Sequence, residues 1–183
     1  MVRPRDLSGA QGDQLYRYLR QGLVKRIARG LYVQSETEGF SQHQSMIEVA
    51  ARVPSGVICL LSALRFHGLT TQAPFEVWVA IDYHARRPNI PELPVRIVRF
   101  SGTAFSAGIE PHLLSGVTVR VFSAAKTVAD CFKYRNKIGL DVAIEALRDC
   151  LSQRKATVDD LWRYAAVCRV ANVMRPYLET LTQ

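Results

Sequence analysis

The last third of the chain carries hydrophobic residues at the spacing of amphipathic helices. A helix is expected from Ser123, which stands where an N-cap should, to about Tyr134. The next apolar residues follow at intervals of four, three and four positions, on one helical face: Leu140, Ile144, Leu147 and Leu151. Thr157 opens a variant of the capping box ahead of a further helix. A last apolar stripe over 170–181 contains Pro176, where a kink or a break is expected.

The pattern between residues 41 and 122 changes between helix and strand. β-branched and aromatic residues favour strands, and the three prolines of residues 84–94 place a loop in their midst. The expected elements are helices over 41–53 and 58–66, strands over 75–81 and 95–100, and a hairpin of 109–114 with 117–122. The sequence therefore predicts an α+β domain with a small mixed or antiparallel sheet and a helical C-terminus.

The first residues of the chain predict a smaller unit. A helix is expected over 11–21, with Leu15 and Leu19 buried and Gly22 as its stop. Two short strands are expected to follow, over 23–27 and 31–33, around a turn that contains Gly30. With one or two helical turns over 3–8, the order of helix, turn, helix and hairpin is that of a winged helix-turn-helix.

The polar segment 34–41 is typical of a linker, so we expect a domain boundary near residue 38. The prediction is thus a winged helix-turn-helix module over 1–38 and a second domain over 39–183. No internal repeat is seen.

Charge separates the same two parts. The chain of 183 residues has a formal net charge of +8, and its first 33 residues hold seven Lys and Arg against two Asp. A basic module on a nearly neutral body favours a nucleic acid as partner. The alternative is a solvated face that only keeps the chain soluble.

The helix predicted over 11–21 has a polar face suited to DNA. If Leu15 and Leu19 face the core of the module, Gln and Arg side chains point outward, and these can pair bidentately with adenine and guanine in the major groove. Basic residues of the hairpin are placed for phosphate or minor-groove contacts. The expected DNA-binding residues are Arg3, Arg5, Gln14, Arg17, Arg20, Gln21, Lys25, Arg26 and Arg29. Tyr16 and Tyr18 are expected to pack against the hairpin rather than stack on bases.

Catalytic patterns are weak. Ser123 and Lys126 match the S-x-x-K pattern of Ser/Lys hydrolases, but the companion S-D-N and K-T-G motifs are missing and an N-cap explains Ser123 better. The four His lack partners at metal-ligand spacing, and the four Cys form no CxxC pair. We expect no enzyme, no catalytic residue, no metal and no cofactor. A hydrolase based on Ser123 stays a minor alternative.

In the segment from residue 125 to residue 137, charged and apolar residues alternate more closely than elsewhere in the body. Lys126 and Asp130 stand four positions apart, and three cations cluster at the helix end. One interpretation is a surface that meets an acidic partner, formed by Lys126, Asp130, Lys133, Arg135 and Lys137. The alternative is helix capping and a solvated face, since cations complement the C-terminal end of a helix dipole.

Other features point to a cytoplasmic protein. No apolar stretch approaches the length of about 20 residues that a membrane helix needs. The N-terminus has charge but no apolar core of a secretory signal. Spread cysteines suit reduced thiols.

Several strings together resemble antitoxins of the AbiEi family. They are residues 14–32, 57–69, 95–101 and 119–139, and the segment from Ser123 to Gly139 is the most specific. The resemblance implies an antitoxin of a type IV (AbiE) toxin–antitoxin pair, a class linked to phage abortive infection. It implies an N-terminal winged helix that represses the operon at inverted repeats in double-stranded DNA. It also implies a C-terminal domain that counteracts a nucleotidyltransferase-like toxin.

The chain departs from that family at its start. Family members carry a further helix before the pair seen here, so the first helix of the module is expected to be absent or encoded upstream of Met1. This keeps a second hypothesis open, in which the chain neutralises a toxin through protein contacts without binding DNA.

Overall fold

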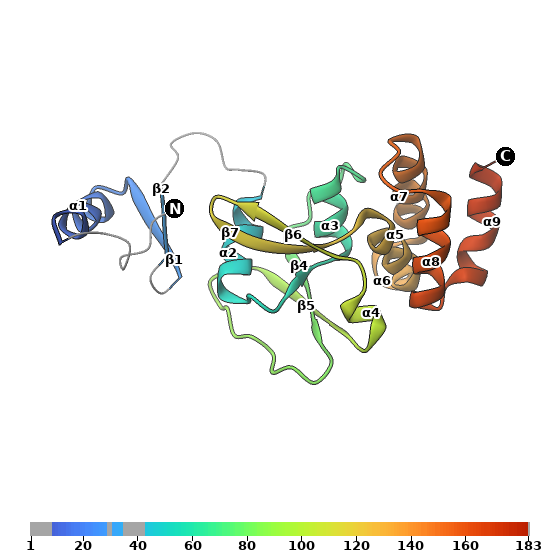
Figure 1. Ribbon diagram of the computed structural model, residues 1–183, viewed down its shortest axis with the longest axis horizontal. Coiled ribbons are helices and arrows are strands. Elements are labelled where there is room, and N and C mark those ends of the chain that lie inside the picture. Colours follow the sequence, from blue (N-terminus) through green and yellow to red (C-terminus); the bar gives the residue numbers. More distant parts are fainter. Residues whose placement is uncertain (1–8, 29–30, 35–42, 183) are drawn as a thin grey trace.

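The computed structural model describes residues 9–28, 31–34 and 43–182 (Figure 1). An N-terminal unit consists of helix α1 (Gly9–Arg20) and the antiparallel strands β1 (Val24–Ala28) and β2 (Leu31–Gln34). The body has the α+β fold that the sequence predicts, with a helical C-terminus. Its elements are α2 (Gln44–Arg52), β3 (Val57–Ile58), α3 (Leu60–His67), β4 (Val77–Asp82), β5 (Val95–Phe100), α4 (Thr103–Ser106), β6 (Ile109–Leu114), β7 (Val117–Phe122), α5 (Ala124–Lys133), α6 (Arg135–Ile138), α7 (Leu140–Ser152), α8 (Val158–Cys168) and α9 (Ala171–Leu181).

The body is built on one mixed sheet of five strands. The strand order is β5-β4-β3-β7-β6. β4 and β5 run parallel, as do β3 and β7, whereas β3 with β4 and β6 with β7 are antiparallel. The sheet therefore ends in β5 on one side and in β6 on the other.

Both faces of the sheet are buried, and β4 shows this most clearly. Its first five residues are all buried, because alternate side chains enter two different cores. Val77, Val79 and Ile81 pack with α2 residues such as Ile47, in one core. Trp78 and Ala80 belong to a larger core with α5, α7, α8 and α9. These C-terminal helices gather at one end of the molecule (Figure 1).

The start of the helix predicted over 58–66 is wrong. Val57 and Ile58 form β3, and α3 begins only at Leu60, which has a positive φ of 46°. A two-residue strand is too short to show the alternation that identifies a strand in sequence. It nevertheless joins the two halves of the sheet, because it pairs with both β4 and β7.

The other predicted elements of the body are confirmed to within a few residues, and the hairpin of β6 and β7 has the predicted bounds. Thr157 and Asp160 form the predicted capping box. Of the kink or break expected at Pro176, the break is wrong, because α9 continues through this residue, and the kink stays a prediction. The short helix α4 was not predicted from the sequence.

In the N-terminal unit, α1 and the two strands lie where the pattern predicts them. Leu15 is 7% exposed, and Gly22 follows α1 with a φ of +71°, as expected of a helix stop. The helical turns predicted over 3–8 and the domain boundary near residue 38 lie outside the described residues.

Candidate functional site

The exposed face of α1 is the candidate nucleic-acid interface. Leu15 is buried and Leu19 is half-buried on one side of the helix. The opposite side is exposed and carries three of the predicted DNA-binding side chains, Gln14, Arg17 and Arg20, and the exposed Gln21 follows in the turn after the helix. The helical wheel therefore separates apolar from polar positions as the sequence predicts.

Two tyrosines flank this exposed face of α1. Tyr16 is 62% exposed and Tyr18 is 37% exposed. Packing of their rings against the hairpin stays a prediction. Gln14 Nε2 donates a hydrogen bond to Tyr18 Oη at 2.9 Å, one helical turn away. This bond holds the Gln14 amide along the helix surface, beside the position of Arg17.

The hairpin follows α1 directly. Lys25 pairs with Val33 and Arg26 pairs with Tyr32 across β1 and β2. Arg26 is exposed, whereas Tyr32 is 6% exposed and anchors the hairpin. The remaining predicted DNA contacts, Arg3, Arg5 and Arg29, lie outside the described residues.

Helix α5 holds the second predicted site, and its first residues have a structural role. Ser123 is its N-cap, and its hydroxyl accepts a hydrogen bond from the backbone N–H of Lys126 at 3.4 Å. Lys126 Nζ instead donates to Asp130 Oδ2 at 2.6 Å. The lysine is therefore paired with a carboxylate and is not placed as a base for Ser123.

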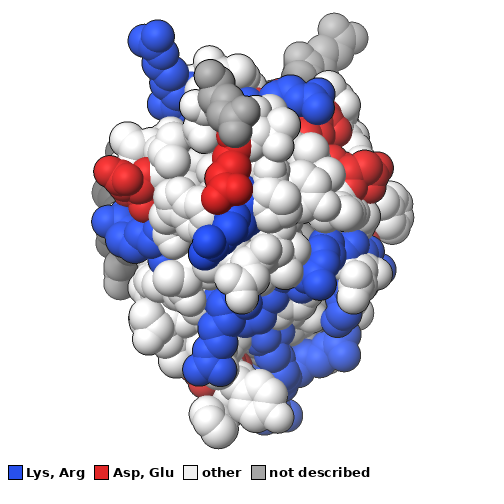
Figure 2. Space-filling view, turned by 90° about the vertical axis from the view of Figure 1, so that its right-hand side faces the viewer, with Lys and Arg blue, Asp and Glu red and all other residues white. Residues whose placement is uncertain are grey.

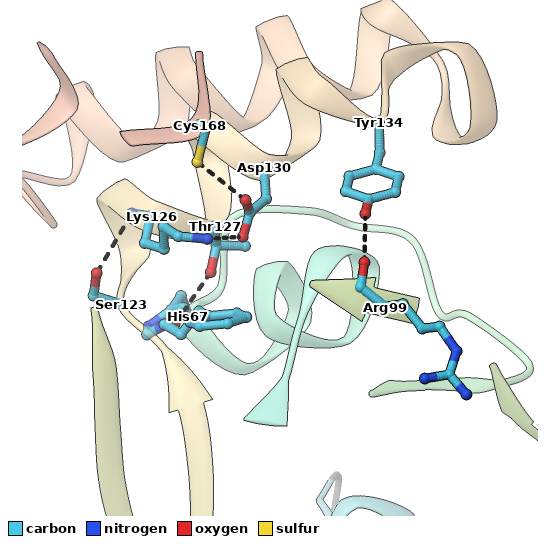
Figure 3. Close-up of polar contacts among 9 residues, drawn as sticks. His67, Arg99, Ser123, Lys126, Thr127, Asp130, Tyr134 and Cys168 are labelled. Atoms are coloured by element: carbon cyan, nitrogen blue, oxygen red, sulfur yellow. Dashed lines mark hydrogen bonds and ion pairs between the residues drawn. The ribbon is translucent and has the colours of Figure 1, made fainter. Parts of the chain in front are cut away.

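The predicted placement of Lys126 and Asp130 on a partner surface is wrong. Both side chains are completely buried. Lys126 Nζ lies 4.2 Å from the centre of the Phe122 ring, and Cys168 Sγ donates to Asp130 Oδ1 at 3.2 Å (Figure 3). The sequence shows the spacing of four but not that α8 covers this face of α5.

Burial dominates the electrostatics of this cluster. Desolvation raises the pKa of the Asp130 carboxyl above its ordinary value, and the neighbouring Lys126 ammonium opposes that rise. Desolvation also raises the pKa of the Cys168 thiol to about 12, and the nearby Asp130 carboxylate adds to the rise. The cluster thus keeps its thiol protonated and ties α5 to α8.

The other three residues of the predicted partner surface lie at the end of α5 and in α6. Lys133 and Lys137 are exposed, and Arg135 is partly exposed and donates to Phe132 C=O at 2.9 Å. Figure 2 shows the end of the molecule that bears the C-terminal helices, where Lys and Arg gather in the lower half and acidic side chains lie mainly in the upper half. Arg135 therefore caps the end of α5, whereas Lys133 and Lys137 contribute charge to the surface.

Sequence reasoning missed a group of residues beside β5. A groove of about 280 Å³ is lined by Trp78, Arg96, Val98, Arg99, Tyr134 and Lys137, together with Ile97. Arg96 stacks over Trp78 at 4.7 Å, and Tyr134 Oη donates to Arg99 C=O at 3.4 Å (Figure 3). The alternation of Val and Ile with Arg over 95–100 could have indicated the Arg side of this groove. The bond to Tyr134 could not be found in this way, because the two residues are far apart in the sequence.

A scan against protein-family models matches none of them, and a search of curated proteins finds no match either.

Across the described part of the chain, every helix is too short or too polar to cross a membrane. The same residues contain no group of three or more His, Cys, Asp or Glu side chains that could hold a metal ion.

Proposed function

We propose that the chain is a DNA-binding autorepressor and antitoxin of an AbiE-like, type IV toxin–antitoxin pair. One observation carries the DNA-binding half: α1 exposes Gln14 and Arg17, Gln21 is exposed in the turn that follows, and a basic hairpin comes next. Gln and Arg read base edges in the major groove, and a hairpin beside a reading helix contacts the backbone.

The charge of the N-terminal unit supports the same function. Arg20 and Arg26 are also exposed, in addition to the proposed base reader Arg17. Arginines next to a reading helix bind phosphates and fix its position on the duplex, while the base contacts supply the preference for one sequence. We infer that the Gln14 amide, which bonds to Tyr18 on the helix surface, needs little ordering before it contacts a base.

The antitoxin half rests on the resemblance of residues 119–139 to AbiEi antitoxins. In this proposal the body counteracts a nucleotidyltransferase-like toxin encoded beside this chain, and the N-terminal unit represses the shared operon at inverted repeats. A cytoplasmic role in phage defence belongs to the same proposal.

The first test measures binding of the full chain to the DNA upstream of its own gene, with scrambled DNA of equal composition as the control. Fluorescence anisotropy is recorded at about 50 and about 200 mM salt, because each phosphate contact adds about −0.9 to the slope of log affinity against log salt. We expect preference for the upstream DNA at both salt concentrations. Equal affinity for both DNAs would refute the repressor.

The second test separates the two halves of the proposal. The neighbouring toxin gene is expressed from an inducible promoter, with and without this chain, and growth is recorded. Rescue of growth without specific DNA binding would favour the alternative, a protein-interaction module, to which the cations Lys133 and Lys137 at the end of the body would then contribute. Failure of both assays would refute the whole proposal.

A further inference from the structure

The outer edge of β5 presents unpaired backbone groups. β5 pairs with β4 alone among the described strands. Val77 N–H donates to Pro94 C=O at 2.8 Å, and Val77 lies opposite Val95 in the parallel register. In a parallel ladder this bond turns the N–H and C=O groups of the even-numbered β5 residues toward β4. Those of Val95, Ile97 and Arg99 therefore point away from the sheet.

This row of groups has almost no internal partner. Tyr134 Oη donates to Arg99 C=O (Figure 3). Within the part of the chain that is described, no other bond reaches the outward groups of β5. The N–H groups of Val95, Ile97 and Arg99 and the C=O groups of Val95 and Ile97 are thus free to pair with another strand.

The opposite edge of the sheet is protected. Ser123 N–H donates to Gly108 C=O at 2.7 Å, which fixes the alternation of the antiparallel β6 and β7 ladder. The backbone N–H and C=O positions of Ile109, Pro111 and Leu113 then point away from β7. Pro111 has no N–H group that an added strand could use. Proline at such a position is a common means of blocking strand addition. β5 itself contains no proline.

Two grooves flank the open edge, one on each face of the sheet. The first is the groove lined by Trp78, Arg96, Tyr134 and Lys137. The second, of about 330 Å³, is lined by Val95 and Ile97 with residues 87–91 of the loop before β5. A strand added to β5 points alternate side chains to opposite faces, so each groove would receive every second side chain.

The charges beside this edge favour an acidic partner. Residues 84–100 contain four Arg and one Glu. Arg87 and Lys137 are exposed, one in each groove, and neither forms an ion pair with a carboxylate of the described residues. Arg96 is paired with Glu76 at 2.7 Å, and the guanidinium of Arg99 donates to backbone C=O groups, Ala85 C=O at 2.9 Å among them. The attraction for a carboxylate therefore comes from Arg87 and Lys137.

We propose that the β5 edge binds an extended acidic segment of a partner protein by strand addition. A peptide backbone supplies both donors and acceptors and so satisfies the outward N–H and C=O groups. A DNA backbone offers acceptors only and would leave the C=O groups of Val95 and Ile97 unpaired. A second copy of β5 would add further Arg side chains to this edge and no carboxylate, because β5 contains two Arg and no Asp or Glu. This site is separate from the proposed DNA interface on α1.

The probe is a fluorescein-labelled heptapeptide in which Glu and Val alternate, titrated into the full chain. We expect saturable binding, and slower hydrogen exchange at the amides of Val95, Ile97 and Arg99. A peptide with Lys in place of Glu should bind at least about tenfold more weakly, as expected for a reversal of charge at two or more contacts. Methylation of every peptide amide removes the donors that would pair with the C=O groups of Val95 and Ile97, so it should abolish binding.

Two variants test the site from the protein side. Ile97→Pro removes an outward N–H that β4 does not use, and it should weaken binding about tenfold, the effect of one or two lost hydrogen bonds. Lys137→Glu should weaken binding of the acidic peptide and strengthen binding of the Lys peptide. Arg148→Glu makes the same charge change at an exposed position of α7 and should leave both affinities unchanged.

The proposal is overturned by any of three results. One is the absence of saturable binding up to about 1 mM peptide, a Kd beyond which an interaction contributes little. Another is unchanged binding of the fully N-methylated peptide, which would exclude backbone pairing. The third is displacement of the peptide by single-stranded DNA or RNA at lower concentration, which would assign the edge to nucleic acid. None of these results bears on DNA binding by α1.

Discussion

Lys126 Nζ lies 2.6 Å from Asp130 Oδ2, and both side chains have no exposed surface. The pair stands one turn apart on α5, in the larger core, and Cys168 on α8 bonds to the second carboxylate oxygen. Buried charges are costly unless each finds a partner, and here the ammonium also faces the rings of Phe122 and Phe100. The pair therefore fixes how α5 packs against α8.

We expect Asp130→Asn to destabilise the fold by about 3 kcal/mol, because it leaves the buried Lys126 ammonium without a counter-charge. Urea unfolding followed by circular dichroism measures the loss. The double variant Lys126→Met with Asp130→Leu should recover most of it, since apolar residues of similar volume can replace a buried pair.

A surface pair supplies the control for that prediction. Arg163 Nη2 lies 2.7 Å from Asp160 Oδ1, with both side chains partly exposed, so Arg163→Ala should cost less than about 1 kcal/mol. Equal losses for Asp130→Asn and Arg163→Ala would contradict the structural role of the buried pair.

His67 gives the fold a dependence on pH. Its Nε2 lies 2.7 Å from Phe122 C=O, and burial lowers the pKa of the imidazole below its ordinary value of 6.5. A histidine with a lowered pKa binds its proton more readily in the unfolded chain. Its contribution to stability is therefore present above pH 6.5 and is lost as the pH falls through the folded-state pKa.

We expect the free energy of unfolding to fall between about pH 7 and pH 5, and to fall less steeply in His67→Gln. Glutamine can still donate to Phe122 C=O but does not titrate. Urea midpoints at several pH values measure the slope. His84→Gln, at an exposed position, is the matched control, and an identical slope in wild type and His67→Gln would refute the prediction.

The four thiols are expected to be unreactive in the folded chain. Cys59, Cys131, Cys150 and Cys168 are all buried and free. Desolvation raises the pKa of Cys150 to about 11 and that of Cys168 to about 12, so little thiolate is present at neutral pH. A thiol reagent such as DTNB should react slowly with the native protein. In urea it should react rapidly with all four cysteines. Rapid labelling of the native protein would contradict this.

Local pattern predicts most of the fold because most elements are longer than one period. The helix after Ser123 and the hairpin of residues 109–122 are confirmed, since a cap residue and a Ser-Gly turn mark their bounds. β3 was missed because two residues show no alternation. Continuation of α9 through Pro176 was missed because helix breaking is a tendency that packing of Met174 and Leu178 overcomes.

The candidate sites divide in the same way. On α1, exposure of Gln14 and Arg17 follows from the helical wheel alone, so sequence predicts it. On α5, burial of Lys126 depends on α8, which lies more than 30 residues later in the chain. Tertiary contacts of this kind cannot be predicted from local residue spacing. The bond between Tyr134 and Arg99 was not predicted for the same reason.

The exposed arginine in the middle of α1 offers the most direct test of base reading. We expect Arg17→Ala to weaken binding to the upstream DNA by about 1–3 kcal/mol and to relax sequence preference, because it removes one bidentate contact to a base. Lys25→Ala on β1 should weaken binding to all sequences alike and reduce the salt slope by about one, as expected of a phosphate contact. Anisotropy titrations with upstream and scrambled DNA measure both effects. Arg148→Ala, at an exposed position of the body, is the matched control. If Arg17→Ala weakens binding to both DNAs equally, Arg17 contacts phosphate, and the base-reading role passes to Gln14 and Gln21.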